Sequence, residues 1–289
     1  SPARAFAPRR ASDGGAPVMS FTPALPLTGY AGWKFLKRTA ATQAAVLNAQ
    51  PEAKRDEAYF REKIGKIDTA ADLVSDRRLL KVALGAFGLE GDINSKAFIQ
   101  KVLEGGTLKE GSLANKLADK QYQKLSAAFG FGDFKTPRSM QSDFPDKILS
   151  AYKARAFEVA VGTQNDDLRL ALNAERELSD LAKKTSTSND ARWYSVLGST
   201  PLRRVFEKAL GLPSSFATLD IDKQLDVMKD KAKSQLGSDQ LADFTNAAAT
   251  ETLLRRFLIR SEADSYRAQY GASAALTLMS QAVSFSRSR

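Results

Sequence analysis

An internal repeat restricts the possible folds of this 289-residue chain more than any other feature of its sequence. A shift of 123 residues, which carries Gly88 onto Gly211, aligns two apolar patterns that each end in a glycine and continue into a loop and a further helix. The matching positions are Leu79, Val82, Ala86 and Leu89 on one side and Leu202, Val205, Ala209 and Leu212 on the other. One residue of slip later, Leu117-Ala118-Asp119 meets Leu241-Ala242-Asp243. The sequence therefore predicts two divergent copies of one module.

Each copy is predicted to be helical, because apolar residues recur three and four positions apart along most of the chain. Leu73, Leu80, Leu84 and Phe87, for example, fall on one face of a helix that stops at Gly88. We expect an all-α fold in which the two copies pack into an elongated or pseudo-twofold helical bundle. A helix pair buries its apolar stripe only against a neighbour, so the copies are expected to share a core. Such a duplication requires residues 69–125 to superpose on residues 192–249 with their helices in the same order.

The periodicity also suggests where the modules begin and end. Glycine, proline and serine interrupt every apolar pattern in residues 130–145, which makes this stretch the expected boundary. The first residues are rich in proline, alanine, glycine and arginine, and Met19 is the expected natural start. The predicted organisation is a disordered arm at 1–24, a first helical module at 25–145, a second module at 146–270, and a helix end with a basic tail at 271–289.

A long helix is expected near the end of the chain, from Asn246 to about Ala282, and the first module contains no obvious counterpart. Its wide apolar face includes Leu253, Leu254, Phe257, Leu258, Tyr266 and Tyr270. Such a helix could pack against the predicted helix that contains Trp33, or it could pair with another chain. We favour packing within the chain.

Cysteine and histidine are both absent from the sequence. Their absence excludes disulfides, zinc or haem sites with those ligands, Ser-His-Asp triads, and cysteine or histidine nucleophiles. No run approaches the roughly 20 apolar residues of a membrane-spanning helix, and the first eighteen residues lack the apolar region of a secretory signal peptide. A soluble protein is therefore expected.

The formal net charge of +10 raises the possibility of a nucleic-acid partner. Three arginine doublets, Arg77/Arg78, Arg203/Arg204 and Arg255/Arg256, each lie inside an apolar helical pattern. A solvated helix face explains such doublets more simply than a phosphate-binding stripe does. A basic helical protein that binds nucleic acid is kept as the alternative function.

Catalytic motifs are incomplete wherever they occur. Tyr59 and Lys63 have no glycine-rich turn before them, and Ser150 and Lys153 lack the companion motifs of serine acyl enzymes. Acidic residues gather at Asn165-Asp166-Asp167 and at Asp220, Asp222 and Asp226, where they suit helix starts. We predict no catalytic, cofactor or metal site, and hence not an enzyme; the second alternative is an enzyme with a carboxylate, lysine and arginine site.

Three segments carry a resemblance to a known family: YAGWKFLKRTAATQ at 30–43, DLVSDRRLLKVALGAFGLEGDI at 72–93 and ETLLRRFLIRSEADSYRA at 251–268. They resemble an alphaproteobacterial family of all-helical proteins of unknown function whose genes often lie among flagellar genes. The resemblance implies a bacterial accessory or structural protein with protein partners, including flagellar components, located in the cytoplasm or at the flagellum. It transfers no functional residue, so the partner-binding residues and the oligomeric state stay open.

Overall fold

The computed structural model describes residues 21–286, with side chains as far as Ser273 except for Ala272. Every regular element in this part of the chain is helical, with thirteen α-helices and five short 3-10 helices. The all-α prediction is thus confirmed. The expected start at Met19, residues 1–20 of the expected arm and the last three residues of the basic tail lie outside the described residues.

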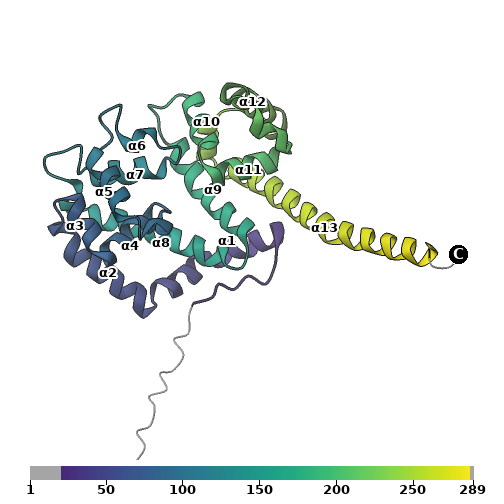
Figure 1. Ribbon diagram of the computed structural model, residues 1–289, viewed down its shortest axis with the longest axis horizontal. Coiled ribbons are helices and arrows are strands. Elements are labelled where there is room, and N and C mark those ends of the chain that lie inside the picture. Colours follow the sequence, from purple (N-terminus) through teal and green to yellow (C-terminus); the bar gives the residue numbers. More distant parts are fainter. Residues whose placement is uncertain (1–20, 287–289) are drawn as a thin grey trace, which may run out of the picture.

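The helices form a body and one long projection (Figure 1). The first part of the body contains α1 (Gly29–Asn48), α2 (Pro51–Lys63), η1 (Ile64–Lys66), α3 (Ala70–Ser75), α4 (Arg77–Ala86), η2 (Glu90–Asp92), α5 (Lys96–Gly105), α6 (Leu113–Lys116), α7 (Gln121–Phe129) and η3 (Arg138–Met140). The rest contains α8 (Phe144–Gly162), α9 (Asp166–Ala182), α10 (Asn189–Leu197), α11 (Thr200–Leu210), η4 (Ser214–Thr218), α12 (Ile221–Leu236), η5 (Leu241–Thr245) and α13 (Ala247–Ser286).

Two glycines of the sequence repeat have matching surroundings. Gly88 follows α4 with φ 70° and Gly211 follows α11 with φ 65°, a conformation that glycine adopts without steric penalty. A Cβ atom on Gly88 would lie 2.6 Å from the Arg155 guanidinium of α8, and one on Gly211 would lie 2.6 Å from the Arg260 guanidinium of α13. The elements α3, α4, η2 and α5 also follow one another as α10, α11, η4 and α12 do. The duplication itself stays a prediction.

The buried apolar residues form two clusters where the sequence suggested one shared core. The N-terminal core is built by α2 to α5, α7 and the first half of α8, whereas the C-terminal core is built by α1, the second half of α8 and α9 to α13. Helix α8 runs through both, since Ile148 and Leu149 lie in the first cluster and Phe157 and Val161 in the second. The two parts are therefore joined along one continuous helix.

Helix α1 packs in the C-terminal core although it precedes the whole N-terminal core in the sequence. Trp33 is fully buried there, and its indole N–H donates a hydrogen bond to Glu251 Oε2 of α13 at 3.2 Å. Tyr30 donates its hydroxyl to Glu251 Oε1 at 2.5 Å, and Lys37 pairs with Glu175 of α9 at 2.6 Å. The predicted packing between the Trp33 helix and the last long helix is thus present.

The residues just before α1 are also held against the body. The backbone N–H of Ala24 donates to Gln43 Oε1 at 2.8 Å, and Gln164 Nε2 donates to the Pro23 carbonyl at 2.6 Å. Phe21 packs on the C-terminal core. The predicted disordered arm was therefore wrong for residues 21–24, because two glutamine side chains satisfy their backbone groups.

Helix α13 belongs to the body only over its first four turns. Leu253, Leu254, Phe257 and Leu258 are buried in the C-terminal core, but residues 262–271 are all exposed. Beyond this point the helix leaves the body and extends into solvent as a single rod (Figure 1). Of the helices that the structure describes, none has an apolar stretch long enough to cross a membrane.

Candidate functional site

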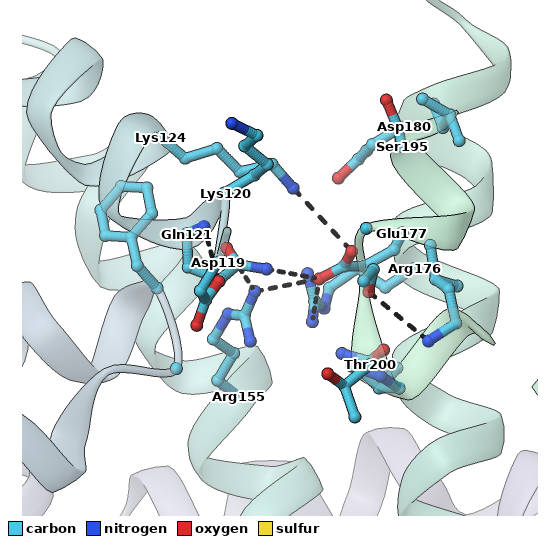
Figure 2. A pocket seen from close by; sticks show the side chains of 18 of the residues that line it. Asp119, Lys120, Gln121, Lys124, Arg155, Arg176, Glu177, Asp180, Ser195 and Thr200 are labelled. Carbon is cyan, nitrogen blue, oxygen red and sulfur yellow. Dashed lines mark hydrogen bonds and ion pairs between the residues drawn. The ribbon is translucent and has the colours of Figure 1, made fainter. Parts of the chain in front are cut away.

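A cleft with a volume of about 870 Å³ separates helices of the two cores. One wall comes from the residues that follow α4, residues between Ala118 and Lys124, and the middle of α8. The other comes from α9, α10 and the start of α11. Charged side chains from both walls converge on it (Figure 2). The cleft brings together residues more than fifty positions apart in the sequence, such as Lys124 and Glu177.

Glu177 of α9 is the centre of this charge cluster. Its side chain is 6% exposed because the same face of α9 carries the buried residues Ala174 and Leu178. Arg155 Nη2 of α8 lies 3.1 Å from Glu177 Oε1, and Lys124 Nζ of α7 lies 3.8 Å from Glu177 Oε2. A carboxylate buried in this way is stable only when cations and hydrogen-bond donors replace its water.

A second carboxylate, Glu158 of α8, pairs with Arg176 of α9. Two bonds at 2.7 and 3.1 Å join the two groups, the bidentate geometry in which guanidinium and carboxylate bind most strongly. Arg176 also lies 3.7 Å from Glu177. The cluster therefore ties α7, α8 and α9 together across the boundary between the cores.

The pKa values at the cluster are set by burial and by the neighbouring cations. Burial raises the pKa of Glu177, but the attraction of Lys124, Arg155 and Arg176 outweighs it, so its net pKa lies below the ordinary value. Burial lowers the pKa of Lys124, and repulsion from Lys184, Arg155 and Arg176 lowers it further against the attraction of Glu177. Positive charge at the cluster is thus only partly compensated.

These pKa values predict loss of stability in acid. Because the pKa of Glu177 is lower in the folded than in the unfolded chain, its contribution is complete above the unfolded carboxyl pKa of about 4.3 and is lost as the pH falls through the folded value. Urea unfolding between pH 7 and pH 3 should show this decrease, and Glu177→Gln should flatten it. An equal pH dependence in the variant would contradict the assignment.

Asn173 of α9 also lines the cleft. Its side chain is 5% exposed, and its Oδ1 atom has no hydrogen-bond partner in the described part of the chain. Lys184, two turns further from Glu177 along the cleft wall, forms no ion pair with any described residue. A buried amide oxygen without a donor is uncommon in folded proteins and calls for a partner.

The arginine doublets that suggested nucleic acid all have partners within the chain. In each doublet one arginine has the following partner: Arg78 pairs with Asp56, Arg204 with Asp166, and Arg256 donates to the Ala209 carbonyl. The others contact Asn94, Glu207 and the Tyr30 ring, for Arg77, Arg203 and Arg255 respectively. These contacts agree with the interpretation that the doublets lie on solvated helix faces and do not form a phosphate-binding stripe.

The side chains of the incomplete catalytic motifs form hydrogen bonds and ion pairs within the fold. Tyr59 donates to Asp76 at 2.6 Å, and Lys153 pairs with Glu57 at 2.7 Å. The acidic groups act as helix caps and pair partners, since Asn165 caps α9, Asp220 caps α12, and Asp166 binds Arg169 and Arg204. Within residues 21–273, no group of three or more carboxylates is placed to hold a metal ion.

Fold and cleft together define an all-helical protein with two apolar cores and a charged cleft between them. The chain belongs to the protein family of unknown function DUF1217, whose model matches residues 86–249. It is similar to the crystal structure of protein AGR_C_984 from Agrobacterium tumefaciens, with 26% identity and a TM-score of 0.67 over 83% of this chain and 98% of that one. The comparison with curated proteins found no match.

Proposed function

We propose that the protein is a non-enzymatic accessory or structural protein of the bacterial flagellum, which binds a flagellar component through the exposed part of α13. The observation that carries this proposal is the projection of α13 beyond Ser261, where each residue from Glu262 to Gly271 is exposed.

The two apolar cores do not need the projecting part of α13 for their own packing. From residue 262 to residue 286 it is about 37 Å long, at roughly 1.5 Å per residue. Helices in water gain most of their stability from packing. Only the base of this part contacts the body, through the pairs of Lys208 with Asp264 and of Thr28 with Glu262. Its exposed part is therefore suited to contact another molecule.

The exposed aromatic residues support a protein partner. Tyr266 and Tyr270 are 62% and 53% exposed, and their rings lie 4.2 Å apart on one side of the helix. Tyrosine offers a large rigid surface with a polar end, and it is enriched at the residues that contribute most to protein interfaces. A flagellar partner is supported by the resemblance of residues 30–43, 72–93 and 251–268 to a family encoded among flagellar genes. The last of these segments includes the base of the projection.

Deletion of the gene is expected to reduce swimming in soft agar, and the wild-type gene should restore it. The double variant Tyr266→Ser with Tyr270→Ser should fail to restore swimming because it removes the aromatic surface without altering a buried residue. Leu108→Ser, at a 71% exposed position on the body, is the matched control and should restore it. Normal swimming of the deletion strain would contradict the flagellar proposal.

A further inference from the structure

We propose that the cleft between the two cores binds a small organic anion that also carries a hydroxyl or amine group. The anionic group would lie beside Lys124 and Lys184, and the hydroxyl or amine would donate to Asn173. This inference concerns the body of the molecule and does not depend on α13 or on a flagellar partner.

The size of the cleft suits a small molecule. Its volume of about 870 Å³ falls in the range of roughly 300–1,000 Å³ found for such sites. Leu170 and Leu202, both buried, supply apolar surface beside the charged residues. A ligand here would contact both cores at once.

Lys124 is the cation best placed for an anion. Among the described residues, its Nζ atom pairs with one carboxylate, Glu177, at the long distance of 3.8 Å. That carboxylate also pairs with Arg155 and Arg176. Its side chain is 48% exposed and lines the cleft, and Figure 2 shows its amine directed toward Glu177. Lys184 adds a second cation without an ion pair among the described residues. Seven cations and five carboxylates line the cleft, so an incoming anion would meet a net positive charge.

The side chain of Asn173 sets a second requirement, which is that the ligand carries a hydrogen-bond donor. Its unpartnered Oδ1 atom can accept a hydrogen bond but cannot donate one, so an anion without a proton to donate, such as sulfate, cannot satisfy it. A hydroxyl or amine beside the anionic group can. The cations and the amide oxygen thus favour an organic hydroxy- or amino-acid anion, or a phosphate ester with a free hydroxyl, over a simple ion.

Isothermal titration calorimetry of the full chain at low ionic strength tests the proposal with malate and with glycerol 3-phosphate, which separate the carboxylate from the phosphate class. At least one of them should bind with one molecule per chain and more tightly than sulfate, which has no donor at neutral pH, while glycerol should not bind. Lys124→Met and Asn173→Leu should each weaken binding by about tenfold, the loss expected for one charge-assisted or one unmade hydrogen bond.

Lys54→Met is the matched control, since Lys54 is an exposed lysine remote from the cleft, and it should bind as the wild type does. Thermal melting guards against misfolding: Asn173→Leu should melt no lower than the wild type, because leucine removes an unpartnered buried oxygen. The proposal is overturned if neither compound binds, or if binding equals that of sulfate and is unchanged in Asn173→Leu.

Discussion

Replacing Trp33 with alanine is expected to lower the free energy of unfolding by about 4 kcal/mol, in the range measured for large aromatic residues in cores. Trp33 is fully buried between α1 and the C-terminal core, so alanine leaves a cavity that the surrounding helices cannot fill. The change also removes the donor to Glu251 of α13. Urea unfolding followed by circular dichroism measures the loss.

Val46→Ala on the same helix is the control for helix propensity, because Val46 is about half exposed; its effect should stay within about 0.5 kcal/mol. Hydrogen exchange in the Trp33→Ala variant should become faster in both α1 and α13. A loss below about 1 kcal/mol for Trp33→Ala would mean that α1 does not pack in the C-terminal core.

Glu177→Gln is expected to lower the free energy of unfolding by about 3 kcal/mol at pH 7, as breaking one side of a buried ion pair typically does. Glutamine keeps the shape of the side chain but leaves Arg155, which is 13% exposed, beside an uncharged amide. Arg176 keeps Glu158 as a partner, so the effect should come mainly from Arg155 and Lys124.

Glu175→Gln in the same helix is the matched control. Glu175 pairs with Lys37 at the surface, and exposed pairs contribute about 0.5 kcal/mol or less. The two variants should therefore differ several-fold in urea unfolding at low salt. Equal losses in the free energy of unfolding would show that the ion pairs of Glu177 contribute no more than the ion pair of a surface carboxylate.

Helix content and many helix ends could be predicted because they depend on nearby residues. Gly88 and Gly211 end α4 and α11 as expected, and the last helix, predicted from Asn246 to about Ala282, is found as Ala247–Ser286. Pro201 lies in the first turn of α11, where its missing N–H has no consequence.

The partners of the helices could not be predicted, because periodicity identifies an apolar face but not what covers it. Trp33 was recognised as apolar and helical, yet its place in the C-terminal core follows from contacts with residues more than two hundred positions away. The charged cleft was missed for a related reason. Glu158, Glu177 and Arg155 look like ordinary surface residues of amphipathic helices, and only the approach of α7, α8 and α9 makes them a buried cluster. A glutamate on the apolar face of α9, next to Ala174 and Leu178, is the one signal the sequence contained.

Photo-crosslinking in living motile cells tests the role of α13 most directly. A benzophenone amino acid at position 266, on the projecting helix, should yield a covalent adduct with a basal-body, hook, filament or export protein when adducts are identified by mass spectrometry. The same amino acid at position 108, which is 71% exposed on the body against 62% for position 266, should not yield that adduct. Absence of flagellar proteins from the position-266 adducts, or the same adducts at both positions, would contradict the proposal that α13 binds a flagellar component.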